Sequence, residues 1–252
     1  MSTQDTWIAH RTPRRAARVR LFCFPYAGGG ASLFRTWSDD LPPEIEVCPV
    51  QLPGREARMA EPLFDRLAPL VEAAADRLMP HLNRSFAFFG HSMGAMISFE
   101  LARLLRSRGA LSPLHLFASG CLPPHVPDPN PIHHLPDDGV VQNMRSFGGM
   151  SEDILQNEEL MRVLLPLLRA DSAVTETYVH SPGAPLRCPI TAFGGHRDNV
   201  VPPGAIEGWS QHTSRGFSSE LFDGDHFFLQ SARGPLLQSV ARRLLASLPG
   251  AR

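Results

Sequence analysis

The sequence predicts an α/β fold in which a mostly parallel central sheet carries helices on both faces. The first observation is that short apolar runs alternate with amphipathic segments through the first 119 residues. This alternation is typical of parallel sheets. The second is that the same alternation returns after residue 187, following a stretch of about 65 residues that contains no predicted strand. We therefore expect one domain over residues 1–252, with a helical insertion at about 121–187.

The strands are predicted from short apolar runs that end at glycine, proline or polar residues. Such runs are typical of buried strands. The first, VRLFCF, is followed at once by a glycine-rich turn, and the third, FAFF, ends at Gly90. The predicted strands cover residues 19–24, 45–50, 86–89, 114–119, 188–193 and 218–222.

The helices are predicted from apolar residues that recur at helical spacing, with Gly109 ending the helix that starts at Ala95. The predicted helices cover residues 31–40, 63–82, 95–108, 137–147, 151–156, 158–179, 205–212 and 236–248. The three helices within 137–179 follow a proline-rich stretch, 121–136, that excludes regular structure. Ligands of such folds bind at the carboxyl ends of the strands, so we expect the insertion to form a lid there. An extra helical layer without a gating role is the alternative.

A G-x-S-x-G motif, Gly90-His91-Ser92-Met93-Gly94, joins the third strand to its helix. A serine on so sharp a turn holds its hydroxyl clear of the sheet, and each glycine avoids a collision with neighbouring backbone. The motif predicts Ser92 as a nucleophile and the Met93 N–H as a donor to an oxyanion. The alternative is a Gly-Ser turn that only connects the two elements.

A glycine-rich turn, Pro25–Gly30, follows the first strand. It lacks both G-x-x-x-x-G-K-[ST] and G-x-G-x-x-G, and the chain contains no lysine, so phosphate binding is disfavoured. The turn instead fits the second half of an oxyanion hole, supplied by the backbone N–H of Ala27. A flexible loop at the end of a strand is the alternative.

An acid and a histidine follow the last two predicted strands. The order Ser92, Asp198, His226 is the chain order typical of α/β-hydrolases. We expect His226 to act as general base and then acid, and Asp198 to fix the tautomer of the imidazole. The remaining candidates are set aside: we expect His91 to point elsewhere, His133, His134 and His196 to lie in loops, and Asp223 and Asp225 to cap a turn.

Composition excludes several classes of function. A net charge of −1 and a pI of about 6.8 argue against nucleic acid and membrane surfaces as partners. The N-terminus has no signal-peptide core, and no 18-residue apolar run occurs. The cysteines Cys23, Cys48, Cys121 and Cys188 are far apart in apolar surroundings, so we expect free thiols in a reducing cytoplasm.

In its motifs the chain resembles the type II thioesterases, the stand-alone editing enzymes of polyketide and nonribosomal peptide biosynthesis. The resemblance rests on LFCFPYAGGGAS, VQLPGREAR, FGHSMGA, PIHHLP, LLPLLRAD, GGHRD and DGDHFFL, in this order from about Trp7 to the last helix. Asp225 departs from the pattern, because the family often has a second glycine before the histidine.

The resemblance implies hydrolysis of stalled or aberrant acyl groups from the phosphopantetheine arms of acyl or peptidyl carrier proteins. It implies no cofactor, and no histidine–carboxylate spacing in the chain suggests a metal. Arg55, Arg58 or the N-terminal arginines are candidates for docking an acidic carrier, although a solvated arginine is the simpler interpretation of each. We expect a monomer. A carboxylesterase or lipase acting on small esters, and a non-catalytic binding protein of the same fold, are the alternatives.

Overall fold

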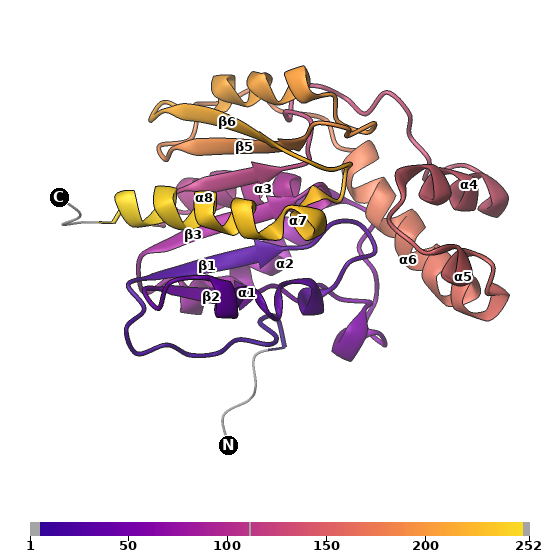
Figure 1. The fold of residues 1–252 in the computed structure, drawn as a ribbon, viewed down its shortest axis with the longest axis horizontal. Helices are drawn as coiled ribbons and strands as arrows, with labels where there is room; N and C mark the ends of the chain where they lie inside the picture. The colour runs from indigo at the N-terminus through magenta and orange to yellow at the C-terminus, as the bar shows by residue number, and fades with distance from the viewer. Residues whose placement is uncertain (1–5, 111, 249–252) are drawn as a thin grey trace.

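A computed structural model describes residues 6–110 and 112–248. Six strands form one parallel sheet in the order β2-β1-β3-β4-β5-β6 (Figure 1). The strands are β1 (Val19–Phe24), β2 (Ile45–Pro49), β3 (Phe86–His91), β4 (Leu116–Ser119), β5 (Ile190–Gly195) and β6 (Phe217–Phe222). The predicted strands are confirmed, with shifts of one or two residues at six of their twelve ends.

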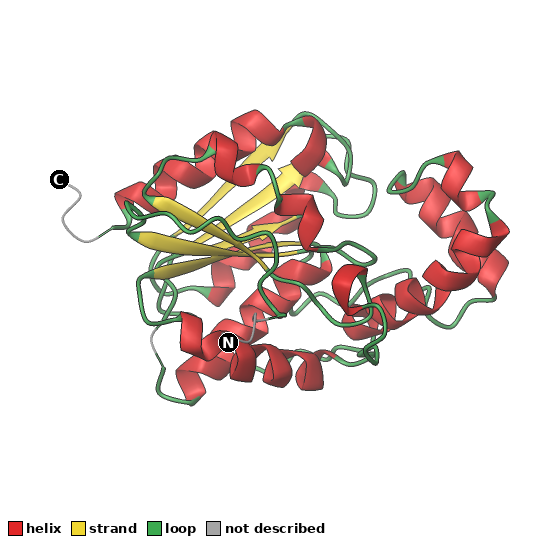
Figure 2. Ribbon diagram, turned by 90° about the horizontal axis from the view of Figure 1, so that it is seen from below, coloured by secondary structure: helices red, strands yellow, loops and turns green. Residues whose placement is uncertain are grey.

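Helices cover both faces of the sheet (Figure 2). Along β1, Phe22 and Phe24 belong to one buried cluster that also includes residues of α2 (Leu67–Leu78), α3 (Met93–Ser107) and the 3₁₀ helix η4 (Pro203–His212). The alternate residues Leu21 and Cys23 pack with α1 (Trp37–Asp40), α7 (Phe228–Ser231) and α8 (Arg233–Ala246). Successive side chains of a strand point to opposite faces of the sheet, so a strand that is apolar throughout contributes to the apolar core on each face.

Between β4 and β5 lies the insertion, with α4 (Asp137–Phe147), α5 (Glu152–Leu155) and α6 (Glu158–Glu176). These helices extend from the side of the sheet where the strands end (Figure 1). They have a small apolar cluster of their own around Leu155, Met161 and Leu168. The predicted helices in this region are confirmed, although α6 ends at Glu176 rather than residue 179. Beyond it, the Tyr178 hydroxyl donates a hydrogen bond to Glu100 of α3 at 2.6 Å.

The prediction of one helix over 31–40 is wrong. A 3₁₀ turn, η1 (Ala31–Phe34), is separated from α1 by Thr36, whose φ and ψ are −96° and 2°. The break allows two large rings to meet the same strand. Phe34 and Trp37 contact each other at 4.8 Å between ring centroids, and both contact Phe89 of β3. Burial of these rings therefore overrides continuous helical geometry.

Other element boundaries also differ from the predictions. Helix α2 starts at Leu67 rather than residue 63, because Leu63 belongs to a loop that folds over Gly54. Helix α3 starts earlier than expected, directly after Ser92. The predicted helix at 205–212 is the 3₁₀ helix η4, and the short helix α7 was not predicted.

All four cysteines are free and buried, as expected. Burial raises the pKa of the Cys121 thiol to about 12, so this group is a poor nucleophile. No helix of the described residues is long and apolar enough to cross a membrane.

His115 gives the fold a pH dependence that is independent of the candidate site. Its ring is buried against Phe117 and bonds Thr191, and burial lowers its pKa from 6.5 to about 4. Between pH 6.5 and about pH 4, His115 is therefore protonated in the unfolded chain but neutral in the folded chain. The free energy of unfolding consequently decreases as the pH is lowered through this window. We expect His115→Gln to flatten the slope of unfolding free energy against pH in this window, measured by urea titration. Equal slopes in both proteins would contradict this assignment.

Candidate active site

The candidate nucleophile lies on a strained turn between β3 and α3. Ser92 has a φ of +52° and a ψ of −118°, and α3 begins at the next residue. Positive φ is uncommon for a residue with a side chain and marks strain that the surrounding structure must sustain. The Ser92 N–H donates to the Ser119 carbonyl at 2.8 Å, which ties the turn to β4.

The two motif glycines permit this turn to form. A Cβ atom on Gly90 would lie 2.1 Å from the Gly94 carbonyl oxygen. One on Gly94 would lie 2.2 Å from the carbonyl oxygen of Phe24 in β1. Both obstructions are backbone atoms of the central sheet and helix, which cannot move aside as a flexible side chain can. The expected reason for the glycines is confirmed.

Asp198 and His226 meet as the sequence predicted. The imidazole Nδ1 lies 2.9 Å from Asp198 Oδ2, and the two side chains are 6% and 0% exposed. The other oxygen, Asp198 Oδ1, accepts the N–H groups of Val200 at 2.8 Å and Val201 at 2.9 Å. These bonds fix the carboxylate and direct one oxygen at the ring, so the imidazole has one preferred tautomer, with its proton on Nδ1.

Three of the other acids and histidines take the places that the sequence analysis gave them. Asp225 Oδ1 accepts the Phe227 N–H at 2.8 Å and so caps the turn beside His226. His133 bonds Glu176 of α6. His91 points beneath the turn, where its Nδ1 lies 2.9 Å from the Ser119 hydroxyl. Burial, and then the nearby His226, hold the pKa of His91 well below its usual range, so this ring is neutral.

A cavity of about 250 Å³ opens between the carboxyl ends of the strands and the insertion. Ser92, Met93, Ala27 and His226 all line it. Its apolar wall comes largely from the insertion: Ile132, Met144, Phe147 and Met150. A smaller cavity of about 90 Å³ adjoins it at Ser92 and is lined by Met96, Cys121, Leu122 and Val201, among others. Ser92 thus lies where the two cavities meet.

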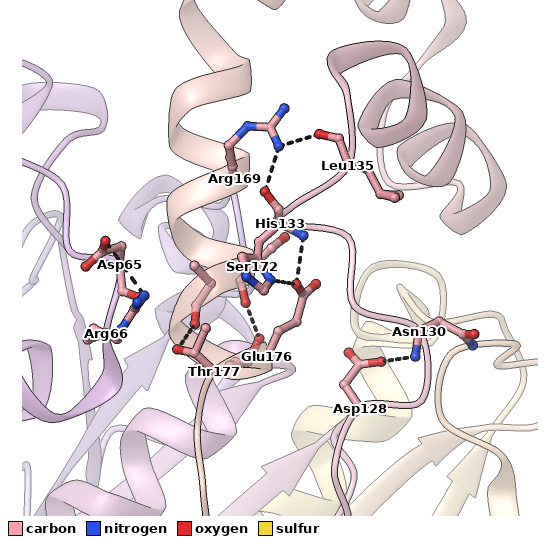
Figure 3. Close-up of polar contacts among 12 residues, drawn as sticks. Asp65, Arg66, Asp128, Asn130, His133, Leu135, Arg169, Ser172, Glu176 and Thr177 are labelled. Carbon is pink, nitrogen blue, oxygen red and sulfur yellow. Dashed lines mark hydrogen bonds and ion pairs between the residues drawn. The ribbon is translucent and has the colours of Figure 1, made fainter.

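Polar contacts fasten the proline-rich stretch to α6 (Figure 3). Arg169 donates to the carbonyl oxygens of His133 and Leu135, each at 2.6 Å. The Glu176 carboxylate accepts the backbone N–H of His133 at 2.8 Å and contacts its ring at 2.6 Å. The proline-rich stretch, which has no regular structure, therefore takes its position over the cavity from the third inserted helix.

The suggestion that Arg55 and Arg58 are solvated or dock a carrier is wrong. Both side chains are buried, at 6% and 5% exposure. Arg58 stacks over the Trp7 ring, donates to the Gln51 carbonyl and pairs with Glu61. Arg55 pairs with Asp171 of α6, 116 positions away in the chain. No local pattern indicates such a partner, which is why the sequence analysis missed it.

Of the methionines in the insertion, Met144 and Met150 line the larger cavity. Met161 is instead buried in the cluster between the inserted helices. Within residues 6–110 and 112–248, no three His, Cys, Asp or Glu side chains gather so as to hold a metal ion. The chemistry available at the site is that of a serine, an imidazole, a carboxylate and backbone N–H groups.

The fold and this arrangement define the class: the chain is a hydrolase of the α/β-hydrolase fold. Residues 19–248 match the family model of the thioesterase domain. The chain belongs to this family and is a thioesterase.

Relatives agree with the family match. The chain is 46% identical to the gramicidin S biosynthesis protein GrsT of Aneurinibacillus migulanus, over 97% of this chain and 96% of the relative. Its structure is similar to RedJ, a thioesterase from the prodiginine pathway of Streptomyces coelicolor, with a TM-score of 0.88, 40% identity and coverage of 92% and 93%. It is also similar to YbtT, the type II thioesterase of the yersiniabactin pathway, with a TM-score of 0.86, 30% identity and coverage of 94% and 97%.

Proposed function

We propose that this chain is a type II thioesterase that hydrolyses stalled or aberrant acyl groups from the phosphopantetheine arms of acyl or peptidyl carrier proteins. The observation that carries the proposal is the set of groups around one cavity: Ser92 on its strained turn and His226 bonded to buried Asp198. YbtT, described as a type II thioesterase of a nonribosomal peptide and polyketide pathway, supports the substrate class.

In the first half of the proposed reaction, the Ser92 hydroxyl attacks the thioester carbonyl carbon while His226 Nε2 takes its proton. The carbonyl π electrons move to the oxygen, and the N–H groups of Ala27 and Met93 stabilise the resulting oxyanion. Collapse of this intermediate breaks the carbon–sulfur bond, and the imidazolium returns the proton to the departing thiolate. The products are an acyl-serine ester and the free phosphopantetheine thiol.

In the second half, water replaces the thiol. His226 removes a proton from the water as it attacks the ester carbonyl, and the same two N–H groups receive the second oxyanion. Collapse expels the serine oxygen, which regains its proton from the imidazolium. The Asp198 carboxylate stabilises the charged ring in both halves without taking its proton.

The insertion serves in this proposal as a lid over the acyl group. Its proline-rich stretch and its helices supply most of the apolar wall of the cavity, which suits an acyl chain. A site between the sheet edge and an insertion also suits a substrate carried on a long, narrow arm.

The test compares three substrates with one acyl group: the acyl-carrier protein, the matching acyl-pantetheine and an oxygen ester. Mass spectrometry follows the carrier, and a thiol or acid assay follows the small substrates. We expect the highest kcat/KM with the carrier-bound thioester. Turnover of the oxygen ester with none of the carrier would overturn the proposal in favour of a carboxylesterase. Turnover of none of the three would favour a binding protein.

A further inference from the structure

We propose that the buried ion pair of Asp171 and Arg55 positions the oxyanion turn, residues Tyr26–Gly29, and so links the inserted helix α6 to catalysis. The inference rests on the proposed function, in which the Ala27 N–H belongs to the oxyanion hole. Neither residue contacts the substrate in this account. Both are positioning residues.

The pair contacts the turn directly. Arg55 and Asp171 form a two-bond pair, Nη1 to Oδ2 at 2.6 Å and Nη2 to Oδ1 at 2.8 Å. Asp171 Oδ2 also accepts the backbone N–H of Gly28 at 2.7 Å, and Arg55 Nη1 donates to the carbonyl of Gly29 at 3.2 Å. One acidic and one basic side chain therefore hold two adjacent residues, Gly28 and Gly29, of the turn that carries the proposed oxyanion donor.

The hydrogen bonds determine which way Ala27 points. The N–H of Gly28 belongs to the peptide group that follows Ala27, and a turn bond joins Gly29 N–H to the Tyr26 carbonyl at 2.9 Å. The peptide groups around Ala27 are thus fixed from two sides. A donor that is held before the reaction begins needs no reorganisation when charge develops, which is the basis of oxyanion stabilisation.

The charges of the pair also suit this place. A lone carboxylate beside the turn would oppose the negative charge that develops on the substrate oxygen. Arg55 cancels that charge while leaving Asp171 Oδ2 able to accept the Gly28 N–H. Buried ion pairs stabilise folds little compared with apolar packing. This pair joins three segments at the oxyanion turn, so we assign it a role in positioning that turn rather than in stabilising the fold.

The three segments are distant in sequence. Gly28 follows β1, Arg55 follows β2 and Asp171 belongs to α6. On the sheet side, Gln51 Nε2 donates to the Arg55 carbonyl at 3.1 Å, and Gln51 Oε1 accepts the N–H of Ala31 at 3.2 Å. The turn is therefore held between an anchored arginine and a helix of the insertion. Movement of α6 would displace the Gly28 peptide.

The test uses the double variant Arg55→Met with Asp171→Leu, which removes both charges and the acceptor of Gly28 while leaving apolar volume. We expect kcat for the acyl-carrier substrate to fall at least about tenfold, towards the 10²–10³-fold loss typical of a missing oxyanion donor. KM should stay within about twofold, because the donor acts in the transition state and not in substrate binding. The single variant Asp171→Asn keeps an amide oxygen that can accept the Gly28 N–H, so it should retain more of kcat than the double variant.

A second readout isolates the oxyanion hole. Propylboronic acid accepts the Ser92 oxygen on boron and becomes tetrahedral, so it occupies the oxyanion hole as the intermediate does. Its dissociation constant should rise in the double variant by about the factor lost in kcat. A role in folding alone would leave this affinity unchanged in the folded fraction.

The control is Glu46→Gln, which breaks another buried pair, with Arg20, at paired positions near the start of β2 and β1. It should lower the melting temperature and leave kcat and boronic acid affinity unchanged. A double variant with the kcat of the wild-type protein would overturn the inference. The proposed function would still stand in that case, provided that turnover by the wild-type protein depends on Ser92. Absence of Ser92-dependent turnover in the wild-type protein would instead overturn the proposed function.

Discussion

Asp198→Asn is expected to lower kcat by about 10³–10⁴-fold with little change in KM or in the fold. In the wild-type protein, the N–H groups of Val200 and Val201 both donate to Oδ1. An asparagine at this position must keep its oxygen towards these donors, so its NH₂ group faces His226 Nδ1. A donor there stabilises the tautomer with the proton on Nε2, and that nitrogen can no longer accept the serine proton.

Steady-state kinetics with a carrier-bound acyl group measures this effect. The matched control is Asp225→Asn, one residue before His226, where the side chain is exposed and accepts the Phe227 N–H, a bond that an asparagine can also accept. This control should keep near-wild-type kcat. Equal losses in both variants would mean that charge near His226, and not the tautomer, accounts for the effect.

Gly94→Ala is expected to abolish activity and to cost several kcal/mol of stability, in the range of severe overpacking. The new methyl group would lie 2.2 Å from the Phe24 carbonyl oxygen, so either α3 or β1 must shift. A shift of either element separates Met93 from Ala27, which lies three residues beyond Phe24. Chemical denaturation and kinetics on the folded fraction would measure the two losses.

Gly234→Ala provides the comparison for this variant. A Cβ atom on Gly234 of α8 would meet no atom within 4 Å. The substitution should be neutral or stabilising, because alanine has fewer conformations than glycine to lose on folding. A full wild-type melting curve and kcat for Gly94→Ala would contradict the packing argument for the turn.

Much of the fold was predictable because its strands are short, most of them are buried, and turns with glycine or proline separate them. The site was predictable where its geometry comes from local sequence. The two glycines of the motif require a sharp turn, and the order of Asp198 and His226 places them at the ends of neighbouring strands.

The rest depended on contacts between residues far apart in the chain. The break at Thr36 follows from the packing of Phe34 and Trp37 on β3. The local sequence pattern does not indicate which strand these two rings contact. Arg55 looked like a surface charge because its partner, Asp171, lies on a helix of the insertion. Pairings of this kind require the tertiary structure.

The most direct measurement of the central claim is peptide mass spectrometry of the protein after brief reaction with an acyl-carrier protein and acid quenching. We expect the peptide that contains Ser92 to carry the added mass of the acyl group. We also expect the rate of acyl release to be at least about 10³-fold lower in the Ser92→Ala variant. Undiminished release by the Ser92→Ala variant, with no acyl group on this peptide in the wild-type protein, would contradict the account.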